Sequence, residues 1–247
     1  MSRVAGFHAV NSRLKKDDGT LRRLYVLEGR RDSRLRSITD LAQRLGLELI
    51  EKPRSELDKL AEGVVHQGVV VESEGEAKAI GGETNLFELL ASRPKPWLIL
   101  VLDSITDPHN LGACLRSADA AGVDAVVSTS DNSVGITHIV RKVASGAAET
   151  VSFFRVSNLQ RTLKKLQDAG VWVHGAAGEG DASVYGTDWT GSVAVVMGSE
   201  GKGLRRLTRE NCDTIFRIPM SGTVSSLNVS VATGVILFEA QRQRANN

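Results

Sequence analysis

The sequence is poor in cysteine: its 247 residues include only Cys114 and Cys212, which form neither a CxxC pair nor a spacing typical of metal ligands. A disulfide framework and a structural zinc site are therefore not expected, and no cluster of His, Cys or carboxylates predicts another metal. Long apolar runs are also absent, since no eighteen consecutive residues are apolar. Residues 1–16 contain no apolar segment followed by a cleavage site of small residues. These absences predict a soluble, cytoplasmic protein.

Two nucleotide-binding motifs are missing as well. The first strongly apolar segment, 97–102, is not followed by GxGxxG, and GxxxxGK[ST] is absent. The missing GxGxxG counts against a dinucleotide-dependent oxidoreductase.

Charge is unevenly distributed along the chain, although the net charge is only +2. Residues 1–36 carry ten Lys/Arg and four Asp/Glu, residues 37–96 carry seven and eleven, and residues 97–247 carry fourteen of each. Neutralising backbone phosphates requires a basic cluster. The cluster at the front of the chain therefore predicts contact with a nucleic acid.

The pattern of apolar residues divides the chain into two parts. Residues 1–75 alternate short strands (23–27, 47–50, 68–71) with helices (33–45, 55–60), which predicts a small α/β domain. Residues 76–96 are interrupted by Gly, Glu and Pro and are interpreted as a linker with one helical stretch at 84–90. From 97 onward, apolar strands (97–102, 125–128, 151–156, 171–174, 193–197, 214–218) alternate with helices (110–121, 138–144, 159–169, 204–210). This alternation predicts a mostly parallel sheet with helices on both faces over 97–247.

Three stretches of the second part carry residues suited to chemistry. In LDSITDPHNLGACLRSADAAG (102–122), Asn110 is predicted to cap a helix on which Arg116, beside Leu115 and Ala118, is partly buried. Such an arginine needs an anion or carbonyl partner, and a purely structural role would pair it with Asp119 or another acid.

The other two stretches each follow a predicted strand. VVMGSEGKGL (195–204) places Glu200 among three glycines, and its carboxylate suits a cationic or hydroxyl-bearing ligand better than a phosphate. IPMSGTVSSLNVSVATGVILF (218–238) runs from a strand through a serine-rich loop into a helix that starts near Asn228. Because ligands bind at the carboxyl ends of strands in open α/β sheets, this loop is predicted to bind a cofactor.

Together, NLGACLRSADAAG (110–122), VMGSEGKGL (196–204) and IPMSGTVSSLNVSVATG (218–234) resemble, in order and spacing, the three motifs of the SpoU (TrmH-like) family of the SPOUT superfamily. Members are RNA ribose 2′-O-methyltransferases that use S-adenosylmethionine. The segment VHQGVVV (65–71) and the basic N-terminal residues also resemble the L30e-like substrate-binding domain of bacterial members. These members include enzymes that methylate a guanosine of 23S rRNA in the peptidyl-transferase region.

The resemblance implies a deep trefoil knot in the C-terminal region and a homodimer formed through it, for which Val231, Val235 and Phe238 are candidates unless they pack on their own sheet. It also implies site residues by matching positions. The catalytic positions are Asn110, Arg116, Glu200, Ser226 and Asn228, and the cofactor-binding positions are Gly198, Ile218, Met220 and Leu227.

Methyl transfer to a ribose hydroxyl requires alignment of the two reactants and loss of a weakly acidic proton. Two roles for Arg116 remain open: it accepts that proton, or it binds a phosphate or the alkoxide while water takes the proton, since arginine has a pKa above about 12. Asn110 and Asn228 are assigned to fixing the ribose and the loops, and Glu200 to orienting Arg116 or the substrate. Ser226 either caps the last helix or supports Arg116.

Alternative functions are a tRNA ribose methyltransferase, whose relatives usually lack a front domain, and an RNA-binding ribosome-assembly factor without turnover. The expected partner is 23S rRNA or a ribosome-assembly intermediate.

Overall fold

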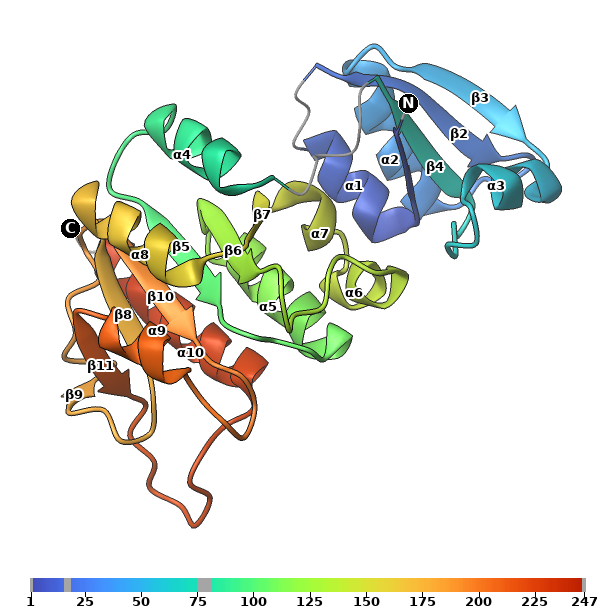
Figure 1. Cartoon of the computed structure of the whole chain (residues 1–247). Coiled ribbons are helices and arrows are strands. Elements are labelled where there is room, and N and C mark those ends of the chain that lie inside the picture. The colour runs from blue at the N-terminus through green and yellow to red at the C-terminus, as the bar shows by residue number, and fades with distance from the viewer. Residues whose placement is uncertain (1, 16–18, 75–80, 246–247) are drawn as a thin grey trace. The chain divides into compact units, whose positions relative to one another are not determined.

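The computed structural model describes residues 2–15, 19–74 and 81–245 (Figure 1). The chain folds into two compact units, the first comprising residues 1–79 with 145–150 and the second comprising 80–144 with 151–247. No helix in the described ranges is both long and apolar enough to span a lipid bilayer.

The first unit is a four-stranded sheet with helices packed on it. Its strands have the order β1-β4-β2-β3, with β2 and β3 parallel and the other neighbours antiparallel. Their bounds are β1 Ser2–Ala5, β2 Leu21–Leu27, β3 Glu48–Lys52 and β4 Val69–Ser73, and the helices are α1 Phe7–Lys15, α2 Ser33–Arg44, α3 Arg54–Leu60 and α7 Ala147–Thr150. The sequence patterns did not predict β1, α1 or α7.

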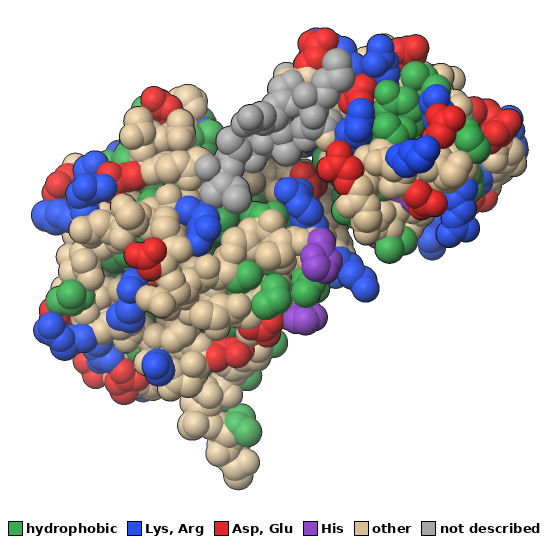
Figure 2. All heavy atoms as spheres, turned by 45° about the vertical axis from the view of Figure 1, so that its right-hand side comes forward, with side chains coloured by type: hydrophobic (Ala, Val, Ile, Leu, Met, Phe, Trp, Pro, Cys, Tyr) green, Lys and Arg blue, Asp and Glu red, His purple; other side chains and the backbone are tan. Residues whose placement is uncertain are grey.

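Much of the positive charge at the front of the chain is neutralised within the first unit. At least five of the basic residues in 1–36 form ion pairs, each with an acid that follows later in the chain: Arg3–Glu72, Arg22–Glu74, Arg23–Glu48, Arg30–Asp32 and Arg31–Glu51. Figure 2 accordingly shows acidic and basic side chains interspersed on the visible face of this unit. A count of basic residues therefore overstates the positive field offered to a nucleic acid.

The second unit contains a seven-stranded sheet in which every pair of neighbours is parallel, with the order β7-β6-β5-β10-β8-β11-β9. This confirms the predicted parallel α/β fold. The strands are β5 Leu98–Leu102, β6 Ala125–Thr129, β7 Phe153–Val156, β8 Trp172–Ala176, β9 Ala182–Ser183, β10 Val193–Met197 and β11 Thr214–Arg217. The helices are α4 Glu83–Ala91, α5 Pro108–Ala120, α6 His138–Ala144, α8 Leu159–Asp168, α9 Arg206–Glu210 and α10 Val229–Ala245.

The apolar strands β5 and β10 form the centre of this sheet, and all of their residues are buried. Ile99 and Val101 share a core with α4 and α8, through residues such as Leu86 and Leu163. Side chains alternate between the two faces of a strand, so Leu98, Leu100 and Leu102 point to the opposite face. Continuous apolar strands are therefore explained by burial on both sides.

Helix α4 falls within the range 76–96, which was predicted to be a linker. Its Leu86 and Leu90 are buried in the core of the second unit. Residues 75–80 lie outside the described residues. The domain limits 1–75 and 97–247 therefore stay predictions, as does the knot, because strand order and register do not test how the chain is threaded.

The structure tests the predicted caps of two helices, and the predicted start near Asn228 of the second one is confirmed. Helix α5 begins at Pro108, and the Asp107 carboxylate caps it by accepting a hydrogen bond from the His109 amide at 2.8 Å. Asn110 is therefore not the cap, because Asp107 and the proline after it already occupy the preferred first positions of a helix. In α10, Asn228 Oδ1 accepts from the Ser230 amide at 2.9 Å, so Asn228 rather than Ser226 caps that helix.

Candidate active site

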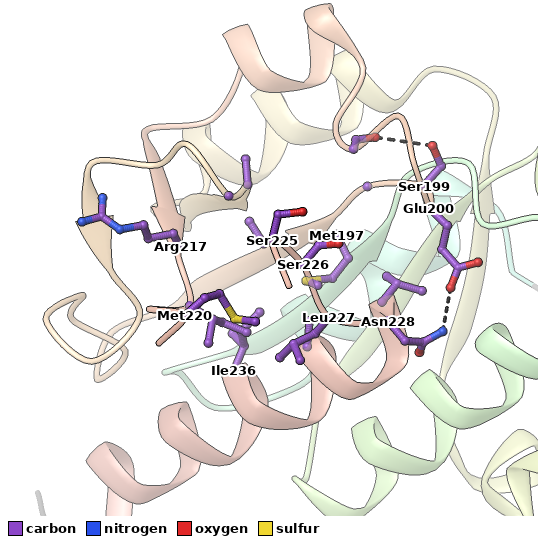
Figure 3. A pocket seen from close by; sticks show the side chains of 18 of the residues that line it. Met197, Ser199, Glu200, Arg217, Met220, Ser225, Ser226, Leu227, Asn228 and Ile236 are labelled. Atoms are coloured by element: carbon purple, nitrogen blue, oxygen red, sulfur yellow. Dashed lines mark hydrogen bonds between the residues drawn. The ribbon is translucent and has the colours of Figure 1, made fainter. Parts of the chain in front are cut away.

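A cavity of about 510 Å³ opens where β8, β10 and β11 end. Its walls come from four segments far apart in the chain: 176–178, 197–203, 216–220 and 225–236 (Figure 3). The strands are parallel, so their carboxyl ends meet at one edge of the sheet, and the loops after them converge there. A volume of this size is typical of a small-molecule site.

The glycine-rich loop after β10 forms one wall of the cavity. Ser199 and Gly203 exchange two backbone hydrogen bonds, of 3.1 and 2.9 Å, which close the loop on itself. A Cβ atom on Gly198 would lie 2.2 Å from the carbonyl carbon of Gly203, and Gly201 has a φ of +76°. The loop therefore has its tight shape because these positions are glycine.

Glu200, in this loop, joins two asparagines from distant segments. Its Oε1 atom accepts hydrogen bonds from Asn110 Nδ2 at 2.7 Å and from Asn228 Nδ2 at 2.6 Å. Asn228 Nδ2 also lies 3.0 Å from Asn110 Oδ1. The structure thus brings three of the five predicted catalytic residues into one polar cluster. Such a cluster can hold the hydroxyl groups of a ribose through amide and carboxylate groups.

Arg116 lies on a different side of α5 from that cluster. Asn110 and Arg116 are six residues apart, which turns their side chains about 120° from a common direction at 100° per residue. Arg116 is exposed, and among the residues that the structure describes it has no hydrogen bond or ion pair. The prediction of partial burial was wrong, because its apolar neighbours Leu115 and Ala118 face the core while Arg116 faces solvent. Neither the expected pairing with Asp119 nor orientation by Glu200 is present.

The predicted cofactor-binding residues Gly198, Ile218, Met220 and Leu227 all line the cavity, as does Ser226. Sequence reasoning did not single out other lining residues, among them Ala176, Ala177, Gly178, Met197, Phe216, Arg217, Ala232 and Ile236. The loop 176–178 follows a strand in a parallel sheet. Only this position at the carboxyl end of a strand could have predicted that the loop lines the cavity.

Helices α5 and α10 pack against each other next to the polar cluster. Cys114 Sγ lies 3.6 Å from Thr233 Oγ1 across that contact. Burial raises the pKa of the Cys114 thiol to about 11 and that of Cys212 to about 12. Both thiols are therefore protonated at neutral pH and neither is a nucleophile. No group of three His, Cys or carboxylate side chains that could hold a metal occurs in the described part of the chain.

Two family models match the chain. Residues 97–238 match the SpoU rRNA Methylase family, and residues 3–77 match a family described as RNA 2′-O ribose methyltransferase substrate binding. The first match spans all three motifs and the segments that line the cavity.

Curated relatives resemble the chain over nearly its full length. The 23S rRNA (guanosine-2′-O-)-methyltransferase RlmB of Shewanella oneidensis is 53% identical over 241 residues, covering 98% of this chain and 97% of its own. The RlmB protein of Haemophilus influenzae is 53% identical over 242 residues, with the same coverage of both chains.

Solved structures share the fold. The SpoU methyltransferase AviRb from Streptomyces viridochromogenes, in complex with the cofactor AdoMet, has a TM-score of 0.73 at 25% identity and covers 99% of this chain and 91% of its own. The TrmH/SpoU tRNA modifying enzyme of A. aeolicus has a TM-score of 0.57 at 31% identity, and covers 66% of this chain and 83% of its own.

Proposed function

The chain belongs to the SpoU rRNA methylase family, and we propose on this basis that it transfers a methyl group from S-adenosylmethionine to the ribose 2′-hydroxyl of a guanosine in 23S rRNA. The main support for this function is the sequence identity of more than 50%, over nearly the whole chain, to proteins that are named for that reaction. The cavity beside the Asn110–Glu200–Asn228 cluster provides the site for it.

The cavity fits S-adenosylmethionine in its chemistry. Ile218, Met220 and Leu227 offer apolar contacts, and the Gly198 backbone can approach a ligand closely because it carries no side chain. The lining contains one carboxylate, that of Glu200, which can attract a positive centre. It also contains one guanidinium, that of Arg217, which donates a hydrogen bond to the Gly180 carbonyl. When bound, the cofactor supplies the methyl group on a sulfonium centre.

The residues of the chain then hold and prepare the ribose. Asn110 and Asn228 each present amide groups that are fixed by Glu200, so they can orient a 2′-hydroxyl without first reorganising. Orientation of this kind lowers a barrier by about 7–11 kcal/mol in the best cases. Ser226, at the cavity wall, is assigned to the same task.

Arg116 has a separate role because it is exposed and lies away from the cluster. A free guanidinium suits a phosphate of the RNA backbone or a developing alkoxide. Binding of a phosphate or alkoxide is therefore the role that its position favours, with direct acceptance of the 2′-hydroxyl proton as the alternative.

The two parts of the chain have different functions, RNA binding and methyl transfer. Residues 1–75, as an L30e-like domain, hold the RNA, and the match of residues 3–77 to a substrate-binding family supports this. Residues 97–247 carry the cofactor site and the reaction. The RNA is 23S rRNA in the peptidyl-transferase region, either free or in a ribosome-assembly intermediate.

A homodimer is the working form, with α10 at its interface. Of the three candidates, Val231 and Phe238 are 53% and 49% exposed and Val235 is half-buried, so packing within the chain leaves about half of Val231 and of Phe238 uncovered. Other residues of α10, such as Ile236 and Leu237, are buried within the chain. Two large apolar side chains seven residues apart lie on one helical face, and a second copy of the chain would cover them.

The experiment that tests the function compares two RNAs. Purified 23S rRNA and total tRNA are incubated with the protein and labelled S-adenosylmethionine, and the modified fragment is located by mass spectrometry. We expect 2′-O-methylguanosine in the peptidyl-transferase region of 23S rRNA. Label in tRNA alone would keep the chemistry and reject the substrate. If neither 23S rRNA nor tRNA is labelled but an isolated assembly intermediate is, the intermediate is the substrate. If none of the three is labelled, the result favours an RNA-binding factor without turnover.

A further inference from the structure

The ion pair between Asp103 and Arg205 connects two elements of the proposed active site without belonging to the polar cluster. Asp103 directly follows β5 and begins the loop to α5, while Arg205 directly follows the glycine-rich loop. The Asp103 side chain is fully buried, and its carboxylate lies 2.7 Å from Arg205 Nη2. The carboxylate also accepts hydrogen bonds from Ser104 Oγ at 3.0 Å and from the Arg205 amide at 3.4 Å.

A buried carboxylate depends strongly on its partner. Removing an ion from water is unfavourable unless a counter-charge and hydrogen bonds replace the water. Arg205 is the cation that pairs with Asp103 among the described residues, and it is itself 44% exposed on its side-chain atoms. The arrangement therefore draws Arg205, and with it the end of the glycine-rich loop, toward β5.

The glycine-rich loop is closed by the Ser199–Gly203 backbone pair, which ties its two ends together. Its start is fixed at Met197, whose carbonyl accepts from the Asp103 amide at 2.8 Å. Its end is fixed by Arg205 on the Asp103 carboxylate. Asp103 therefore holds both ends of the loop that carries Gly198 and Glu200.

The same loop is also attached through Glu200 to Asn110 on α5. We infer that Arg205 is a positioning residue for methyl transfer: its ion pair with Asp103 sets the glycine-rich loop so that Gly198 shapes the cofactor site and Glu200 reaches Asn110 and Asn228. This inference rests on the proposed function. Arg205 acts through the loop and does not touch the substrate.

The full-length protein with Arg205→Ala tests the inference, and Arg206→Ala is the matched control. Arg206 is the next residue, and its ion pair with Glu210 at 2.7 Å is exposed at both ends. Four quantities are measured: thermal unfolding, S-adenosylmethionine affinity by calorimetry, RNA affinity by filter binding, and kcat and KM with 23S rRNA. We expect Arg205→Ala to weaken cofactor affinity and lower kcat, each by about tenfold to 100-fold, the scale of a misplacement near 1 Å. RNA affinity stays unchanged, and Arg206→Ala behaves like the wild type.

Arg205→Lys distinguishes positioning from a general loss of stability. Lysine keeps the charge but not the planar guanidinium, so we expect it to restore folding fully and kcat only in part. A purely structural role predicts that any variant folded at the assay temperature has wild-type kcat and cofactor affinity, and that result for Arg205→Ala would overturn the inference. Equal losses in Arg206→Ala would overturn it as well.

If Arg205→Ala does not fold, the pair Asp103→Asn with Arg205→Gln removes the charge at both ends and keeps two hydrogen-bonding side chains. We expect this variant to fold with the same losses in cofactor affinity and kcat, and wild-type values in it would refute the inference. Failure of the wild-type protein to methylate RNA would instead refute the proposed function, so the two failures are distinguishable.

Discussion

Asn110 Nδ2 on α5 donates a hydrogen bond of 2.7 Å to Glu200 Oε1, a residue that lies 90 positions later in the chain. The same oxygen accepts from Asn228. One carboxylate oxygen thus joins the helix of the first motif, the loop of the second and the helix of the third. The two donors to this carboxylate are neutral amides. Moving the negative charge from Glu200 to a neighbouring position therefore tests directly whether the cluster is needed for activity.

Replacing Asn110 by Asp places a second carboxylate 2.7 Å from Glu200, where the two negative charges repel. We expect Asn110→Asp to lower kcat by about 100-fold. Adding Glu200→Gln restores one carboxylate and one amide in exchanged positions, and we expect the double variant to regain at least part of the activity. Steady-state kinetics on 23S rRNA measures both effects. A double variant no more active than Asn110→Asp would show that the pair does not act as proposed.

Arg116→Lys separates the two roles of this exposed arginine. If Arg116 accepts the 2′-hydroxyl proton, lysine has a lower pKa and shifts the rising limb of the pH–rate profile to lower pH. If it binds a phosphate or alkoxide, the limb stays in place while turnover falls. The position of Arg116 away from the cluster leads us to expect the unshifted limb. Arg161→Lys, also an exposed arginine, is the control.

Gly198→Ala should block the cofactor site while leaving the sheet intact. The added Cβ would lie 2.2 Å from the Gly203 carbonyl carbon, so the closed loop has to open. We expect cofactor affinity, measured by calorimetry, to fall by more than about tenfold. Gly191→Ala is the control, because a Cβ at Gly191 would meet no atom within 4 Å. Wild-type affinity in Gly198→Ala would mean that the loop is not part of the cofactor site.

His174 makes the second unit sensitive to acid. Burial lowers the pKa of this imidazole below its usual value, and its ring lies edge-on to Trp189 at 5.2 Å. The folded state therefore favours neutral His174, whereas the unfolded chain binds a proton below about pH 6.5. The resulting stability is present above that pH and is lost as the pH falls toward the lowered pKa.

Denaturant unfolding followed by tryptophan fluorescence measures this effect, because all three tryptophans (Trp97, Trp172 and Trp189) lie in the second unit. Between about pH 8 and pH 5.5 the free energy of unfolding should fall less in His174→Gln than in the wild type. The other histidines contribute equally to both proteins. Identical slopes would contradict the prediction.

Val231→Glu combined with Phe238→Glu tests the proposed dimer. Two carboxylates on the exposed face of α10 would be buried without partners in a dimer interface. We expect light scattering to show a dimer for the wild type and a monomer for the variant. Tyr185→Glu, which changes a side chain that is 58% exposed elsewhere, should remain dimeric. A monomeric wild type would reject the proposal.

Much of the architecture could be predicted from local patterns. The apolar runs that form β5 and β10 predicted strands buried on both faces, and the start and end of α6 and β10 agree with the structure to the residue. Errors arose where a competing local signal was stronger, as with Asp107, which caps α5 in place of Asn110. The ion pairs of Arg3, Arg22 and Arg23 with later acids also could not be predicted, since they depend on strand pairing.

The sequence by itself determined the type and order of most elements and the three motifs, because periodicity, turn residues and spacing are local properties of the chain. Only the tertiary structure decided which of the motif residues meet. Strand β8 lies between β10 and β11, so the loop 176–178 joins the cavity although no motif contains it. The rotation of α5 brings Asn110 to Glu200 and turns Arg116 toward solvent. Strand order and helix rotation are set by packing across the whole sheet, and no local pattern records them.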